Sequence, residues 1–261
     1  MYLYSELQKK AATGDTIRVC LIGAGKFGSM FLSQAVTTIG LKVTIIADLN
    51  PDRSRLNCKT VGWSDEQIES TDFSDDALAS IRRDDVDVVV EATGHPPSGV
   101  RHAREAFKMG KHIIMVNVEA DVLAGPLLAI EAASAEVVYS MAYGDQPALT
   151  CELVDWARSC GFHVTAAGKG TKYLPAYHAS TPDTVWDYYG ISHAEAADAG
   201  MNSKMFNSFL DGTKSGLEMA AIANACNLAP PPDGLSFPPC GMNDLAHILR
   251  PSSEEGRLKI N

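Results

Sequence analysis

The sequence lacks three features that mark whole classes of protein. It has no apolar run near the ~18 residues that a membrane-spanning helix needs, and its first segment, MYLYSELQKKAATGD, is polar and amphipathic rather than a signal peptide. It has no basic excess, because 22 Lys and Arg stand against 32 Asp and Glu, for a net charge of -10. Its six cysteines form no CxxC pair and no zinc-ligand spacing.

Each absence excludes a class of function. A protein that neutralises nucleic-acid phosphates needs a basic face, so nucleic acid is not an expected partner. Without an apolar span or signal peptide, no membrane association is expected and the cytoplasm is the default location. The cysteines are expected to be reduced and mostly buried rather than catalytic. At 261 residues, the chain can form one large domain or two modest ones.

A glycine-rich turn lies between an apolar run and a helical pattern. Residues 17–28 read IRVCLIGAGKFG, in which Gly23, Gly25 and Gly28 form a GxGxxG motif. In dinucleotide-binding folds, the first glycine allows a tight turn, the second lets a pyrophosphate approach and the third lets the helix pack on the strand. Asp48 ends a second run, KVTIIAD, about 20 residues further on, where a carboxylate binds the adenosine ribose. We therefore predict a dinucleotide site.

Strand-like runs alternate with helical patterns through the first half of the chain. The later runs are DVDVVVEATG, KHIIMVNV and EVVYSMAYG. This alternation predicts an α/β fold with a doubly wound (Rossmann) parallel sheet. Beyond it the chain is rich in Gly, Pro, Tyr and Lys, which favours a second, smaller α+β substrate domain. The predicted divisions are a Rossmann domain at 1–142, a substrate domain at 143–240 and a C-terminal tail at 241–261.

Ligands of such a sheet bind beyond the carboxyl ends of its strands. Arg53 and Arg55 follow Asp48, and either guanidinium could hold a 2′-phosphate. The alternative is that both are solvated arginines at the start of a helix. NADPH is therefore the expected cofactor, with NADH as the alternative. Thr93 and Gly94 are expected beside the nicotinamide, while His95 either faces substrate or caps its loop. The predicted cofactor-binding residues are Gly23, Gly25, Lys26, Phe27, Gly28, Asp48, Arg53, Ala92, Thr93, Gly94 and Asn117.

Acidic residues follow the later strand-like runs. Glu119 and Asp121 would lie near the point of hydride transfer, or would simply favour the first turn of a helix. Asp145 is better explained as a helix cap.

The second half contains the candidates for binding substrate. Lys169 and Lys172 lie on a glycine-flanked turn, where ammonium and backbone N–H groups can converge on a phosphate or carboxylate. Asp211, Lys214 and Glu218 are spaced i, i+3 and i+7 and are expected on one helix face. Such a set can polarise a carbonyl, move a proton or, with a further carboxylate, bind a divalent ion. The alternative is a solvated face of ion pairs.

Six segments together carry a family resemblance. They are VCLIGAGKFG, VVVEATG, VNVEADVLAGPLL, YGDQPALTCELVDWAR, GKGTKYLPAYHASTPDTVWDYYG and NSKMFNSFLDGTKSGLEMA. The chain resembles the homoserine dehydrogenase-like oxidoreductases, in particular the 1-deoxy-D-xylulose 5-phosphate reductoisomerase-like enzymes. The resemblance implies NADPH-dependent isomerisation and reduction of 1-deoxyxylulose 5-phosphate to methylerythritol 4-phosphate, in isoprenoid precursor synthesis. Members of that group usually continue into a C-terminal SAF-like region, whereas this sequence ends at Asn261. Two explanations are possible: the chain is shortened, or it is a short relative of the group.

One departure separates the chain from true homoserine dehydrogenases. Those enzymes have a sequence similar to Thr-x-Asn-Lys, in which the lysine is catalytic. At the matching place this chain reads Val116-Asn117-Val118-Glu119, with a carboxylate instead of the lysine. A carboxylate there is compatible with a rearrangement assisted by Mn²⁺ or Mg²⁺.

We therefore predict a NAD(P)H-dependent reductoisomerase or reductase that acts on a small phosphorylated carbonyl compound. The alternatives are a homoserine dehydrogenase-type enzyme acting on an amino-acid aldehyde and a non-catalytic dinucleotide sensor. A homo-oligomer is expected because MAAIANACNLA is apolar on more than one face, although core packing explains this equally well. The predicted catalytic residues are Lys172, Lys204, Asp211, Lys214, Glu218 and Glu119, and the predicted substrate-binding residues are Lys169, His178, Asn202 and Asn207.

Overall fold

A computed structural model describes residues 3–259. The chain divides into two compact units, Met1–Tyr143 (unit 1) and Gly144–Asn261 (unit 2), and residues 241–261, predicted as a separate tail, belong to unit 2. The helices and strands of unit 1 are α1 (Leu3–Ala12), β1 (Ile17–Ile22), α2 (Lys26–Ala35), β2 (Leu41–Ala47), α3 (Pro51–Thr60), α4 (Asp65–Glu69), β3 (Asp72–Ser74), α5 (Ala77–Ile81), β4 (Val88–Glu91), α6 (Pro96–Lys108), β5 (His112–Met115), α7 (Val118–Ser134) and β6 (Tyr139–Met141).

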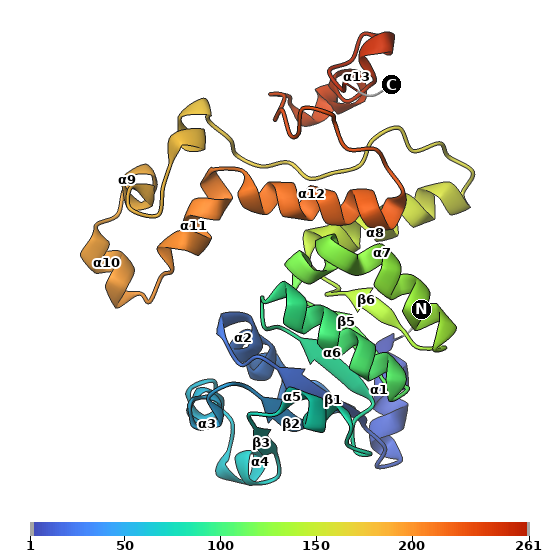
Figure 1. Cartoon of the computed structure of the whole chain (residues 1–261), viewed down its shortest axis with the longest axis vertical. Helices are drawn as coiled ribbons and strands as arrows, with labels where there is room; N and C mark the ends of the chain where they lie inside the picture. Colours follow the sequence, from blue (N-terminus) through green and yellow to red (C-terminus); the bar gives the residue numbers. More distant parts are fainter. Residues whose placement is uncertain (1–2, 260–261) are drawn as a thin grey trace. The chain divides into compact units, whose positions relative to one another are not determined.

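Unit 1 is built around one six-stranded sheet with the order β3-β2-β1-β4-β5-β6 (Figure 1). Every pairing between neighbouring strands is parallel. The order reverses between β1 and β4, which is the point where doubly wound sheets bind their ligands. The prediction of a Rossmann-type parallel sheet is confirmed.

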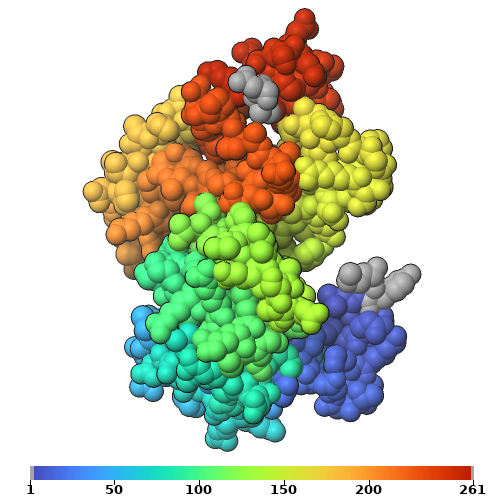
Figure 2. Space-filling model, turned by 45° about the vertical axis from the view of Figure 1, so that its right-hand side comes forward, coloured from blue at the N-terminus to red at the C-terminus, as the bar shows by residue number. Residues whose placement is uncertain are grey.

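Helices bury both faces of this sheet (Figure 1). Along β1, Val19 and Leu21 pack against the side of α2, α3 and α4, whereas Cys20 and Ile22 pack against α5, α6 and α7. On the surface of unit 1, the green residues of α6 and α7 form one continuous face (Figure 2). Burial on both sides explains why the strands read as continuous apolar runs rather than as alternating patterns.

Unit 2 consists of helices and extended segments. Its elements are α8 (Gln146–Ser159), η1 (Pro175–Ala179), α9 (Val185–Tyr189), α10 (His193–Asp198), α11 (Ser203–Leu210), α12 (Thr213–Cys226), η2 (Met242–Asp244), α13 (Leu245–Ile248) and η3 (Ser252–Glu254). Over residues 144–259 the structure contains no strand, and an isolated bridge joins Pro251 to Leu258. The α+β character predicted for this unit is therefore wrong. Glycine and proline disfavour strands, and the extended segment at 162–174 finds no neighbouring strand to pair with.

Two small cores hold unit 2 together. In one, α8 packs on α12 through Val154, Ile222 and Cys226. In the other, Trp186, Phe206 and neighbouring apolar side chains join α9, α10 and α11. Packing on α8 accounts for part of the apolar surface of MAAIANACNLA, so this helix gives no separate argument for the expected homo-oligomer.

Over residues 3–259, no helix has the length and apolar character needed to cross a bilayer.

Candidate functional site

The three glycines of the β1–α2 turn occupy different environments. A Cβ at Gly23, whose φ is +92°, would lie 2.8 Å from the carbonyl oxygen of Ala92, and a Cβ at Gly28 would collide with the carbonyl oxygen of Gly23. A Cβ at Gly25 would meet no atom within 4 Å. Gly25 also begins α2 without a side-chain cap for the first N–H groups of the helix. The turn thus offers an open surface and free backbone donors, as a pyrophosphate requires.

Asp48, predicted to bind ribose, holds the turn together. Its Oδ2 accepts a hydrogen bond from the backbone N–H of Ala24 at 2.8 Å, and its Oδ1 accepts from the N–H of Asn50 at 2.9 Å. The guanidinium of Arg53 is 3.1 Å from the same Oδ1, and the Arg53 side chain is more than half exposed. Arg55 instead lies over the ring of Phe73, 4.3 Å from its centroid. Of the two arginines proposed for a 2′-phosphate, Arg53 is therefore the one beside Asp48.

The segment after β4 is held by a network of polar side chains. Asn117 begins α7, where its Oδ1 accepts from Ala120 N–H at 3.1 Å. Its Nδ2 donates to the hydroxyl of Thr93 at 3.3 Å and to the carbonyl of His95 at 3.1 Å. His95 begins α6 and accepts a hydrogen bond from Ser98 N–H, as the capping alternative predicts. Among the other predicted cofactor residues, Gly94, Lys26 and Phe27 are exposed and Ala92 is half-buried.

The acids after β5 and β6 begin helices. Glu119 is half-buried and Asp121 is buried, and both lie in the first turn of α7. The hydroxyl of Tyr139 donates to Asp121 Oδ1 at 2.6 Å. Burial raises the pKa of Asp121, and the hydrogen bond from Tyr139 partly opposes this rise. Asp145 begins α8 and accepts from Gln146 N–H at 2.9 Å, so the capping interpretation is confirmed.

A buried carboxylate between two lysines is the main charged cluster of unit 2. Glu218, on α12, is only 2% exposed, and its Oε2 forms an ion pair with Lys169 of the extended segment. Lys214 Nζ lies 3.6 Å from Glu218 Oε1, one turn earlier on the same helix. Burial, and secondarily the Lys214 ammonium, lowers the pKa of Lys169, while Asp145 opposes this shift. We call Lys169, Lys214 and Glu218 the lysine–glutamate cluster.

Asp211 does not share a helix with Lys214 and Glu218, and this prediction is wrong. Asp211 is the C-terminal cap of α11, and α12 starts only at Thr213. Gly212 separates the two helices with a φ of +88°, which favours glycine and interrupts the helical repeat. The carboxylate of Asp211 accepts from Asn207 Nδ2 at 2.9 Å and from Thr213 N–H at 2.8 Å.

The remaining predicted residues of unit 2 lie in varied surroundings. Asn202 begins α11 and accepts from Lys204 N–H at 3.0 Å. Asn207 is buried, and its Oδ1 has no hydrogen-bond partner among residues 3–259. The side chains of Lys172, His178 and Lys204 are exposed. The structure therefore brings Lys169 and Lys214 to Glu218, but it does not gather all the predicted residues into one cluster.

A divalent metal does not fit the lysine–glutamate cluster. Both oxygens of Glu218 face ammonium groups, and a further cation between them would be repelled. No group of three or more His, Cys, Asp or Glu side chains suited to a metal is found within residues 3–259.

The sequence prediction missed a third buried acid, Glu91 at the end of β4. Its carboxylate is fully buried and contacts Thr93 and His102. The sequence feature that could have indicated Glu91 is an acidic residue at the end of the apolar run VVVE. From the sequence alone, such a residue cannot be distinguished from an acid on the surface.

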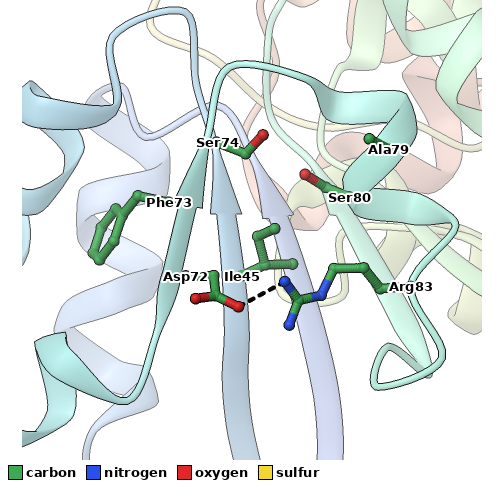
Figure 3. Close-up of a pocket in the computed structure, with 7 residues that line it drawn as sticks. All are labelled: Ile45, Asp72, Phe73, Ser74, Ala79, Ser80 and Arg83. Atoms are coloured by element: carbon green, nitrogen blue, oxygen red, sulfur yellow. Dashed lines mark ion pairs between the residues drawn. The ribbon is translucent and has the colours of Figure 1, made fainter.

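A surface hollow of about 430 Å³ lies apart from the predicted site residues (Figure 3). It is formed between β3, β2 and α5 of unit 1, where the side chains of Asp72 and Arg83 point toward each other and form an ion pair of 2.6 Å (Figure 3). Because none of its lining residues belongs to the predicted cofactor set, the hollow is not part of the candidate site.

Two family models match the chain. Residues 17–115 match a model described as an oxidoreductase family with an NAD-binding Rossmann fold. Residues 144–261 match a model described as oxidoreductase DRL, catalytic domain. The first model thus matches a segment of unit 1 that includes the glycine turn and most of the parallel sheet, and the second matches the whole of unit 2. Neither description names a homoserine dehydrogenase or a reductoisomerase.

Solved structures resemble the chain at low identity, and no curated protein matches it. A "probable dehydrogenase" from Thermotoga maritima is 16% identical with a TM-score of 0.45, covering 80% of this chain and 55% of that one. Biliverdin reductase from Synechocystis, in complex with biliverdin and NADP⁺, is 15% identical with a TM-score of 0.41, covering 55% and 42%. Scyllo-inositol dehydrogenase from Lactobacillus casei is 16% identical with a TM-score of 0.40, covering 55% and 43%.

The chain thus spans between 42% and 55% of the length of these three structures. At such scores the similarity carries no argument about substrate or activity.

Proposed function

We propose that the protein is a NAD(P)H-dependent reductase or reductoisomerase that acts on a small phosphorylated carbonyl compound. The observation that carries the proposal is the lysine–glutamate cluster of unit 2, where one buried carboxylate meets two ammonium groups. Two positive charges against one negative charge leave a net positive charge at a half-buried site. Such a site favours an anionic substrate and an oxygen that becomes negative during reaction.

The residues of unit 1 fit a nicotinamide dinucleotide. Gly25 leaves open space above the backbone, and α2 begins there without a side-chain cap. Bound at this turn, the cofactor supplies a hydride to the carbonyl carbon. Arg53, beside Asp48, is free to turn toward a 2′-phosphate because its side chain is more than half exposed, which supports NADPH over NADH.

In the proposed reaction, Lys169 is the proton donor. Its ammonium hydrogen-bonds to the carbonyl oxygen and transfers a proton to that oxygen as the carbon accepts hydride. The lowered pKa of Lys169 favours this transfer, and the carboxylate of Glu218 orients the ammonium. Lys214 keeps a positive charge beside the developing alkoxide. The exposed Lys172 and Lys204 are the proposed ligands of the substrate phosphate, with His178 and Asn207 as further substrate contacts.

The isomerisation step is the finer part of the proposal. Since a divalent ion does not fit the lysine–glutamate cluster, we assign no step to Mn²⁺ or Mg²⁺. Glu119 is proposed as the general base that would remove a hydroxyl proton from the substrate before rearrangement. Without that rearrangement, the same cluster would carry out simple carbonyl reduction.

Oxidation of NADPH or NADH tests the activity. The substrates are 1-deoxyxylulose 5-phosphate, the same sugar without phosphate, and aspartate semialdehyde. We expect turnover of the phosphorylated sugar, and kcat/KM at least tenfold lower without the phosphate, because a charge-assisted contact contributes about 1.5–3 kcal/mol. Turnover of the semialdehyde alone would favour a homoserine dehydrogenase-type reaction. Tight cofactor binding without turnover of any substrate would favour a dinucleotide sensor.

Two variants test the roles within the cluster. Lys169→Gln removes the proton donor, so kcat is expected to fall about 10²–10⁴-fold while cofactor affinity is unchanged. Glu218→Gln removes the orienting charge and is expected to lower kcat in the same direction. The matched control is Glu131→Gln, which removes a half-buried carboxylate that pairs with Arg104 in unit 1. Wild-type turnover in both cluster variants would contradict the proposed roles.

A further inference from the structure

Glu91 is a buried acid at the point where the strand order of the sheet reverses. It is the last residue of β4, which pairs with β1 at the reversal, and its side chain is fully buried. Its Oε1 accepts a hydrogen bond from the hydroxyl of Thr93 at 2.6 Å and lies 3.1 Å from Nδ1 of His102 on α6. Its Oε2 has no hydrogen-bond partner among the described residues. A buried carboxylate with one unpaired oxygen is costly and calls for an explanation.

The contacts of Thr93 give its hydroxyl a defined direction. The oxygen accepts from the backbone N–H of His95 and from Nδ2 of Asn117, both at 3.3 Å. A hydroxyl has one proton to donate, and here it is directed to Glu91 Oε1. Glu91 therefore fixes the direction of the Thr93 hydroxyl, while Asn117 ties the same segment to the start of α7.

The segment 92–95 adjoins the glycine turn. A Cβ at Gly23 would lie 2.8 Å from the carbonyl oxygen of Ala92, so the two loops are in direct contact. With the pyrophosphate at the β1–α2 turn and the adenosine ribose on the β2 side near Asp48, the other half of a dinucleotide extends toward β4. Thr93 and its neighbours then line the nicotinamide half.

We propose that Glu91, supported by His102, is a positioning residue for the nicotinamide half of the bound dinucleotide and that it acts through Thr93. The inference rests on the dinucleotide binding of the proposed function. Glu91 does not contact the cofactor. It sets the direction of the Thr93 hydroxyl and thereby the shape of the loop that the nicotinamide contacts.

Comparison of two ligands tests this role. NADPH, or NADH if it binds more tightly, is compared with the matching ADP-ribose, which has the adenosine and pyrophosphate but no nicotinamide. In Glu91→Gln, the amide oxygen can still face Thr93, but a neutral amide is a weaker acceptor than a carboxylate and holds the Thr93 hydroxyl less firmly. We expect about a tenfold loss of affinity for the reduced dinucleotide, equal to about 1.4 kcal/mol, and wild-type affinity for ADP-ribose. The control Glu131→Gln, which removes a half-buried acid of α7 outside the proposed cofactor contacts, is expected to change neither affinity.

A second pair of variants keeps the test decisive if Glu91→Gln does not fold. Thr93 is exposed, so Thr93→Val and Thr93→Ser are both expected to fold. The valine variant should reproduce the nicotinamide-specific loss, and the serine variant should restore most of the affinity. In Glu91→Gln combined with Thr93→Val, the loss should not exceed that of either single variant, because both act through one hydroxyl.

Other outcomes overturn the inference. Equal loss of NADPH and ADP-ribose affinity would show that Glu91 only maintains the fold, and no loss of either would show that it plays no part in binding. Either result leaves the proposed reductase activity intact. Conversely, a nicotinamide-specific loss in a protein that turns over none of the tested substrates would support this inference while the proposed activity fails.

Discussion

At the scale of single residues, three buried acids have neighbours of different character. Glu218 faces two ammonium groups, Glu91 faces a hydroxyl and an imidazole, and Asp121 faces the phenol of Tyr139. Only Glu218 has cations that can compensate its charge directly. The other two are placed where they hold hydrogen-bond donors in fixed directions, so their contribution is geometric and carries a cost in stability.

For Asp121, that cost depends on pH. Burial raises its pKa above the ordinary 3.8, so the folded protein retains a proton that the unfolded chain has already released. The free energy of unfolding therefore falls as pH rises from about 3.8 to the raised pKa of the folded protein, with a slope that approaches about 1.4 kcal/mol per pH unit between the two pKa values. Asp121→Asn keeps an acceptor for Tyr139 and cannot ionise, so this decrease should disappear.

Urea unfolding at several pH values between about 4 and 8 measures the effect. Other titrating groups act equally in both proteins, so the informative quantity is the difference in unfolding free energy between wild type and Asp121→Asn. We expect this difference to shift in favour of the variant as pH rises. Asp84→Asn, which removes an acid elsewhere in unit 1, is the control. A pH-independent difference would contradict the raised pKa.

At the scale of elements, different glycines of the β1–α2 turn are required for packing and for binding. A Cβ at Gly28 would collide with the carbonyl oxygen of Gly23, whereas a Cβ at Gly25 would meet nothing. Gly28→Ala is therefore expected to cost about 1–3 kcal/mol of stability, because the helix must move away from the strand. Gly25→Ala should be within ~0.5 kcal/mol of wild type, yet bind NADPH at least tenfold more weakly, because its methyl group occupies the path of the pyrophosphate.

Thermal unfolding and titration with NADPH check both halves of this prediction. The two alanine variants serve as each other's controls, since they add the same methyl group three residues apart. If Gly25→Ala bound NADPH as wild type does, the pyrophosphate would not approach at this glycine, and the assignment of the turn would be wrong.

Local patterns account for what the sequence predicted at this scale. The parallel sheet follows from apolar runs alternating with helical spacing, and the roles of the glycines follow from a motif within one turn. The break at Gly212 was missed because the spacing of Asp211, Lys214 and Glu218 fits a continuous helix, while the break depends on a backbone conformation stabilised by Asp211 itself. The contact of Lys169 with Glu218 joins an irregular segment to a helix, and no periodic pattern reports such a contact.

At the scale of the whole molecule, the chain combines two units of unlike construction. Unit 1 has a sheet with both faces buried, and unit 2 has short helices with two small cores. The proposed cofactor contacts all lie in unit 1, on the segments that follow the carboxyl ends of its strands. A ligand that binds only the folded form raises the free energy of local unfolding most in the segments that it contacts.

Hydrogen exchange of the whole chain with and without NADPH tests this distribution. At about a hundred times its Kd, NADPH stabilises the binding-competent form by about 2.7 kcal/mol. We expect the greatest slowing of exchange at residues 23–28, 48–53 and 92–95, and little change in α13, which contains none of the proposed binding residues. ADP-ribose should protect the first two segments but leave 92–95 close to the free state, because it has no nicotinamide. Protection confined to unit 2, or spread evenly over the chain, would contradict the cofactor site.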